Sequence, residues 1–161
     1  IQPFITRTHA RTPVALVLAS IVTIRSEARG SDLVHLRRVF ERELAWGRGS
    51  QVAAASGFFV AAFDGPGRAI RCAAAVVEIA GRSGIITSAG VHVGECDLSN
   101  GTGPILEISA KLADAAHPGD VYVSRTIVDL VHGSGLEFVD RGGLTATGLT
   151  RDLPMLKMTE A

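Results

Sequence analysis

The sequence predicts an α+β fold with the element order β-α-β-β-α-β followed by α-β-α-β-β. Two observations carry this prediction. Apolar runs rich in β-branched residues alternate with segments in which apolar residues recur every three or four positions, and Gly or Pro separates many of them. In addition, two short apolar runs in the first half have only a Ser-Gly pair around their junction, which is typical of a β-hairpin.

The chain opens with a strand and a helix. Residues Val14–Ile24 are apolar and β-branched with few breaks, as expected of a central strand that is covered on both faces. Residues Asp32–Trp46 form a predicted helix, which Gly47 and Gly49 end. Its apolar residues share one face: Leu33, Leu36, Phe40 and Leu44.

A hairpin and a second helix follow. The hairpin is expected over Ser50–Ala55 and Gly57–Phe63, with its turn around Ser56 and Gly57. Asp64 is expected to cap the next helix, which has Pro66 in its first turn and ends at Gly81. A strand over Ile85–Glu95 completes a split βαβ, ferredoxin-like arrangement.

The second half supplies the C-terminal αβαββ extension. The expected elements are a helix from Pro104 to Ala115, a strand over Val121–Val123, a helix over Thr126–Val131, and strands over Leu136–Val139 and Leu153–Met158.

Composition restricts the partners and the compartment. The chain has 161 residues, 47% of them apolar, which suits one domain with a sizeable core. Sixteen basic and 16 acidic residues balance, so we expect neither nucleic acid nor a membrane surface as partner. The longest apolar stretches are shorter than the roughly 18 to 20 residues that span a bilayer. We expect a cytoplasmic protein.

The two cysteines, Cys72 and Cys96, have no metal-binding spacing and are expected to be buried free thiols. We also expect no cofactor.

Residues 1–12 show little apolar periodicity and are interpreted as a linker from an upstream domain, which leaves 13–161 as the folded domain. His92, on a strand, is expected to be a hydrogen-bonded core residue, and Trp46, at a helix end, is expected to pack.

Three segments carry a resemblance to a known family. They are FDGPGRAIRCA (Phe63–Ala73), AGVHVGE (Ala89–Glu95) and PGDVYVSRTIVDLVHGSGLEFVDRG (Pro118–Gly142). In order and spacing they resemble the class III adenylate/guanylate cyclase homology domain, particularly its actinobacterial members, over about Val14 to Met158. The resemblance implies a cyclase-like fold and a scaffold in which a triphosphate is converted to a cyclic nucleotide.

That reaction depends on metal ions, which two aspartates hold in the family, one on the first strand and one in the hairpin. Matching the family pattern to this chain puts Ser20 at the first aspartate and Gly57, or Ser56 after a one-residue shift, at the second. The phosphate-wrapping Gly-Ser-Thr corresponds to Thr23, Ile24 and Arg25, whose β-branched members should obstruct an anion cradle. The resemblance therefore predicts a degenerate metal site.

The other catalytic positions differ from the family as well. Ala53 stands at the base-recognising position, and Glu107 and Lys111 replace the Asn and Arg of the third helix. Thr147 corresponds to a phosphate-binding lysine of the final hairpin. Lysine keeps a charge but lacks the bidentate fork of arginine.

Three functions remain open from the sequence. The leading hypothesis is a catalytically inactive cyclase homology domain that acts as a dimerisation or regulatory module, with a homodimer implied by the family. The alternatives are a nucleotide cyclase with residual or altered activity, and a sensor that binds a small molecule in the vacated cleft.

Overall fold

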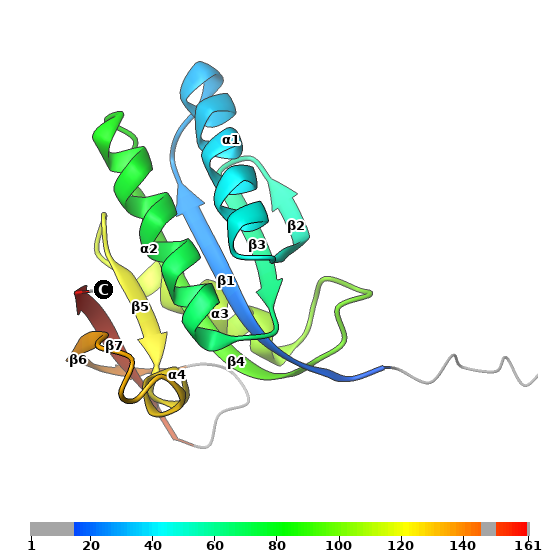
Figure 1. Ribbon diagram of the computed structural model, residues 1–161, viewed down its shortest axis with the longest axis vertical. Coiled ribbons are helices and arrows are strands. Elements are labelled where there is room, and N and C mark those ends of the chain that lie inside the picture. The colour runs from blue at the N-terminus through cyan, green and yellow to red at the C-terminus, as the bar shows by residue number, and fades with distance from the viewer. Residues whose placement is uncertain (1–14, 146–150, 161) are drawn as a thin grey trace, which may run out of the picture.

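The computed structural model describes residues 15–145 and 151–160 (Figure 1). Their elements, in chain order, are β1 (Val17–Ser26), α1 (Gly30–Trp46), β2 (Ser50–Ala55), β3 (Phe58–Phe63), α2 (Pro66–Arg82), β4 (Thr87–Cys96), α3 (Pro104–Ala115), β5 (Val121–Ser124), α4 (Arg125–Leu130), β6 (Glu137–Leu144) and β7 (Leu153–Glu160).

The strands form one seven-stranded sheet in the order β2-β3-β1-β4-β5-β7-β6. β1 is antiparallel to both of its neighbours, β3 and β4, whereas β4 and β5 are parallel. The first four strands with α1 and α2 are therefore the predicted split βαβ core, and β5, β7 and β6 extend it at one edge. The α+β fold class is confirmed.

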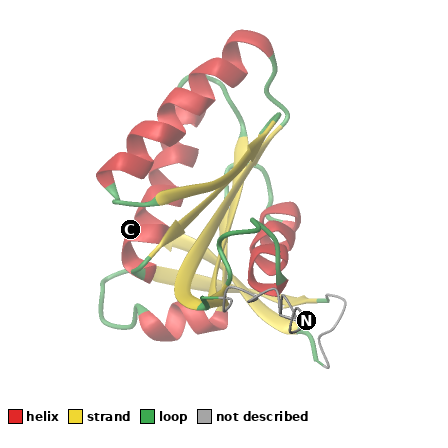
Figure 2. Ribbon diagram, turned by 90° about the vertical axis from the view of Figure 1, so that its right-hand side faces the viewer, coloured by secondary structure: helices red, strands yellow, loops and turns green. Residues whose placement is uncertain are grey.

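Helices cover the two faces of the sheet unequally. Successive side chains of a strand point to opposite faces, and on β1 Val22 and Ile24 join the core beneath α1 and α2, whereas Ala19 and Ile21 pack with Leu106 of α3. Figure 2 shows the sheet between these two layers. We call α1 and α2 the α1/α2 layer, and the helix on the opposite face of the sheet the α3 layer.

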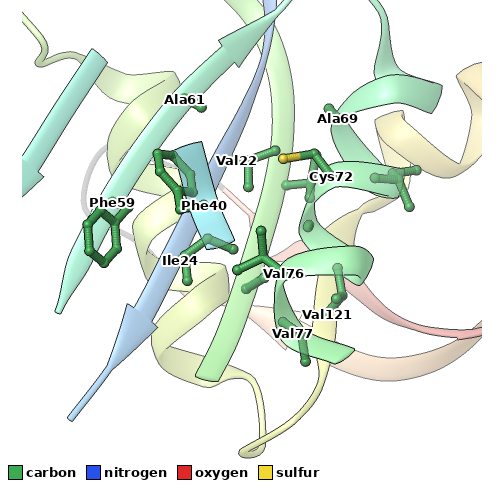
Figure 3. Close-up of a cluster of buried hydrophobic side chains, with 14 of the residues drawn as sticks. Val22, Ile24, Phe40, Phe59, Ala61, Ala69, Cys72, Val76, Val77 and Val121 are labelled. Carbon is green, nitrogen blue, oxygen red and sulfur yellow. The ribbon is translucent and has the colours of Figure 1, made fainter. Parts of the chain in front are cut away.

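The larger core lies between the sheet and the α1/α2 layer (Figure 3). Phe40 of α1 and Phe59 of β3 are both buried, with ring centroids 5.2 Å apart. Val76 of α2 and Ile24 of β1 are fully buried in the same cluster. Burying a side chain of this kind is worth about 1.5–3 kcal/mol, so this cluster fixes both helices on the sheet.

Some boundaries differ from the sequence-based expectation. β1 continues to Ser26 because Arg25 and Ser26 still pair with β4, although they are polar. Asp64 does not cap α2: the N-cap residue is Gly65, without a side-chain cap, and Asp64 forms an ion pair with Arg68 instead.

The expectation that Trp46 packs is wrong, because its side chain is 80% exposed. The cause is the phase of α1. Leu36, Phe40 and Leu44 point to the core, and Trp46 lies two residues after Leu44, which is about 200° around the helix at 3.6 residues per turn. The indole therefore faces solvent.

The α3 layer approaches the sheet closely at Gly90 of β4. A Cβ atom at this position would lie 2.2 Å from the backbone oxygen of Ser109 and 2.5 Å from the backbone nitrogen of Ala113. The buried Ser109 hydroxyl lies 2.9 Å from Thr23 Oγ1 and 3.0 Å from the carbonyl oxygens of both Ile21 and Gly90. This contact ties α3 to β1 and β4 at once.

The close approach predicts that Gly90→Ala destabilises the fold. The added methyl group meets helix backbone, which can only move as a unit, so we expect a loss of about 2–3 kcal/mol in the free energy of unfolding. Gly81→Ala is the matched control, since nothing lies within 4 Å of its Cβ and alanine favours a helix by up to ~1 kcal/mol over glycine. Urea unfolding measures both; equal midpoints for the two variants would contradict the close contact.

Candidate functional site

The candidate site lies where the end of β1 meets the turn between β2 and β3. Ser26 of β1 donates its backbone N–H to the carbonyl oxygen of Gly57 at 2.8 Å. Gly57 has φ +70°, and a Cβ atom there would lie 2.1 Å from the carbonyl oxygen of Ser26. The turn therefore requires glycine at position 57, which leaves no room for a metal-binding side chain.

The structure does not bring Ser20 and Gly57 together. Ser20 pairs with Phe63 at the far end of the hairpin, whereas Arg25 pairs with Phe58, next to the turn. Ser20 and Ser26 are six positions apart on β1, which is about 20 Å at 3.3 Å per residue. Ser20 is also buried, 2% exposed, and shares its strand face with Val22 and Ile24, away from α3. Ser20 and Gly57 therefore lie at opposite ends of the hairpin, and their match to the two aspartate positions of the family stays a prediction.

The β1 side chain that lies beside the turn is Arg25. Its guanidinium forms an ion pair with Asp114 of α3, with 2.6 Å between Nη1 and Oδ1, and lies over the Phe58 ring, 5.6 Å from the centroid. About half of each charged side chain is exposed. The guanidinium therefore lies between Asp114 of α3 and Phe58, the residue that begins β3 just after the turn.

Sequence reasoning missed the position of Arg25. It matched Thr23, Ile24 and Arg25 to a phosphate-binding loop, but all three are strand residues that pair with β3 and with β4. Their backbone groups serve these two ladders rather than an anion. The sequence carries no signal for this, because Arg25 and Ser26 are both polar and the apolar pattern of the strand stops at Ile24.

The remaining expected site residues are spread over β2 and α3. Ala53 is half-buried at a register shift of β2 and packs against the smaller core of the α3 layer. Glu107 is exposed and Lys111 half-buried, and they are four residues apart on α3, which places them one above the other. Thr147 lies outside the described residues.

Two hollows flank the end of β1. One, of about 290 Å³, is lined by residues of β1, β4 and α3, including Arg25 and Asp114. The other, of about 500 Å³, is lined by the residues that follow β1 and by Ser56 of the turn. Neither hollow is lined by Ser20, Ala53 or Gly57.

The remaining titratable groups expected to be buried are core residues. His92 is 6% exposed, and its Nδ1 lies 2.7 Å from the hydroxyl of the buried Ser124. Burial lowers its pKa to about 4. Cys72 and Cys96 are buried free thiols, and burial, aided by Glu43, raises the pKa of Cys72 to about 12. The predictions for His92 and both cysteines are confirmed.

Within residues 15–145 and 151–160, no three or more His, Cys, Asp and Glu side chains gather in a way that could hold a metal ion. The same ranges contain no helix with the length and hydropathy of a membrane span.

Comparison with known proteins shows what the architecture resembles. No protein-family model and no curated protein matches the chain. Solved structures do match. An adenylate/guanylate cyclase/hydrolase from Silicibacter pomeroyi superposes with a TM-score of 0.78 at 18% identity, covering 91% of this chain and 99% of that one. The chain has the fold of a class III cyclase domain.

Other cyclase domains share this fold at lower identity. A Trypanosoma brucei adenylate cyclase, described in its monomeric state, matches with a TM-score of 0.75 at 12% identity over 88% of this chain and 87% of that one. The dimeric guanylyl cyclase domain of the RhoGC fusion protein from Blastocladiella emersonii matches with a TM-score of 0.69 at 10% identity over 88% and 95%. The cyclase fold thus occurs in both association states among these structures.

The lowered pKa of His92 predicts acid sensitivity. Between pH 6.5, the ordinary value, and about 4, the unfolded chain binds a proton that the folded chain does not. The free energy of unfolding should therefore be highest above pH 6.5 and fall by on the order of 3 kcal/mol as the pH approaches 4. Urea unfolding across this range should show a flatter pH dependence for His92→Gln than for the exposed-site control His132→Gln. Parallel curves for both variants would contradict the assignment.

The turn geometry predicts that restoring an aspartate does not restore a metal site. Gly57→Asp should lower the free energy of unfolding by at least about 2 kcal/mol, because of the positive φ and the contact with the Ser26 carbonyl. Ser56→Asp, at the exposed neighbouring position, should stay within about 0.5 kcal/mol of the wild type. Calorimetric titration of folded Gly57→Asp with Mn²⁺ should show no binding that Ser56→Asp lacks; tight binding would contradict the geometry.

Proposed function

We propose that this chain is a catalytically silent cyclase-fold domain that acts as a dimerisation and regulatory module of a larger signalling protein. The observation that carries the proposal is the position of Arg25. This side chain stands beside the hairpin turn and is paired with Asp114, and we assign it the place that the first-strand aspartate has in active members of the family.

The assignment follows from what two metal-binding aspartates must do. Two catalytic metal ions lie about 3.5–4 Å apart, so the residues that share them must come from neighbouring positions of the fold. The second aspartate of the family lies in the hairpin, and the β1 residue that pairs next to the turn of this hairpin is Arg25. Its side chain also faces α3, the helix that carries the other family site positions, Glu107 and Lys111.

Each substitution acts against turnover. A guanidinium in place of a carboxylate repels a divalent cation, and Gly57 offers no ligand. The exposed carboxylate of Glu107 repels a polyphosphate, and Lys111 cannot form the two parallel hydrogen bonds that an arginine guanidinium makes with a phosphate. Loss of one transition-state contact typically costs about 2–4 kcal/mol. The combined loss, although not additive, leaves no path through a metal-bound triphosphate.

A regulatory role is supported by the intact packing of the cyclase fold. The residues that build the sheet and the α3 contact, such as Gly90 and Ser109, keep a close-packed scaffold. Active cyclases of the family work as dimers, and we expect this chain to form a homodimer with an isologous interface. Association, rather than catalysis, is then the property that the domain contributes to its signalling protein.

The test measures product and association on the same preparation. Purified protein with Mn²⁺ and ATP or GTP should give no cyclic AMP or cyclic GMP above a protein-free blank, in an assay that detects an active class III cyclase in parallel. Sedimentation velocity should show a dimer that becomes more populated with concentration. Cyclic nucleotide formation that Arg25→Ala or Asp114→Ala changes would overturn the silent assignment, and a monomer at all concentrations would overturn the dimer.

A further inference from the structure

An exposed tryptophan surrounded by arginines lies where α1 ends and α2 begins. Trp46 is the only tryptophan of the chain and is 80% exposed. It shares a hollow of about 490 Å³ with Arg42 and Arg48, and a second hollow of about 280 Å³ with Arg68 and Arg71. These five residues are called the Arg–Trp patch below.

The patch is more basic than the chain as a whole. Basic and acidic residues of the chain balance at 16 each, but among the described residues the ion pairs of the four patch arginines and the linings of the two hollows include two carboxylates. Asp64 pairs with Arg68, and Glu43 lines the smaller hollow. Arg42, Arg48 and Arg71 are exposed. A net positive charge thus remains around the indole.

The smaller hollow has an apolar floor. Beside Trp46 it is lined by Gly47, Cys72 and Ala75, and Cys72 is buried in the main core. Such a floor can accept an apolar side chain, and burial of a large apolar surface such as an indole contributes on the order of 2 kcal/mol or more. Tryptophan and arginine are also the residue types that contribute most to protein–protein binding.

We propose that the Arg–Trp patch binds an acidic protein segment that places an apolar side chain against Trp46 and carboxylates against Arg42, Arg48 and Arg71. Charge complementarity selects the acidic partner. The carboxylate of Glu43 within the hollow opposes a densely charged phosphate chain, whereas an extended peptide can direct its own carboxylates to the arginines around it. The patch belongs to the α1/α2 layer, so the inference does not rest on the proposed loss of catalysis.

Trp46 itself reports the binding. The probe is a short peptide of alternating glutamate and leucine without tryptophan, titrated into the full chain at low salt. We expect the emission of Trp46 to shift to shorter wavelength and to saturate, and a peptide with glutamine in place of glutamate to bind at least about tenfold more weakly. Sodium chloride should weaken the binding, because exposed charges are screened.

Charge reversal locates the site. Arg42→Glu and Arg71→Glu should each weaken peptide binding by about tenfold or more, with circular dichroism confirming that the variants are folded. Arg141→Glu, at an exposed arginine of the edge strand β6, is the matched control and should bind as the wild type does.

Several results would overturn the proposal. They are no spectral shift with the acidic peptide, equal affinity for the glutamine peptide, and unchanged affinity in both patch variants. Inorganic tripolyphosphate or phosphatidylserine vesicles that bind more tightly than the peptide and displace it would also overturn it, since the patch would then recognise phosphate.

Discussion

The double pairing of β1 determines most of this structure. Because β1 pairs with β4 over its whole length and with β3 from Ser20 to Arg25, its register decides which side chains meet the hairpin turn and which enter the two cores. The side chains of Val22 and Ile24 point to the α1/α2 layer, so the side chain of Arg25 must point to the α3 layer, because successive side chains of a strand alternate between faces. A shift of one residue would exchange the two faces and bury the guanidinium in the main core. The ion pair with Asp114 is thus a consequence of strand register.

The sequence predicted the fold well because the fold depends on long periodic segments. Apolar β-branched runs and helical spacing located every element, and the Ser-Gly pair located the hairpin. The candidate site was predicted less well, since a match by sequence counts positions without knowing where a strand ends. Ser20 was selected by such counting, whereas its pairing with Phe63 places it at the end of the hairpin away from the turn. The prediction that Trp46 packs was wrong for a similar reason. Its exposure depends on the direction in which the helix presents the residues after Leu44, the last core residue of α1.

Two polar interactions connect β1 with α3: a hydrogen bond between Thr23 and Ser109, and the ion pair between Arg25 and Asp114. Each is called a tie below, and they differ in burial. The buried tie joins Thr23 and Ser109 through hydroxyl groups that are fully enclosed, so loss of one partner would leave a buried polar atom unpaired, at a cost of about 1–3 kcal/mol. The tie at Arg25 is half-exposed, and such pairs contribute about 0–1 kcal/mol. Stability therefore explains the buried tie but does not require an arginine at position 25. What the arginine changes is the charge beside the hairpin turn.

The two layers separate the two surfaces of interest. The candidate site faces α3, whereas the Arg–Trp patch lies where α1 ends and α2 begins, on the other side of the sheet. A partner on the patch would therefore leave the α3 layer free for a second copy of the chain. The α1 helix joins both regions, since it begins just after Arg25 and Ser26 and ends at Trp46. Its burial through Phe40 against Phe59 makes it a rigid connection between the end of β1 and the patch.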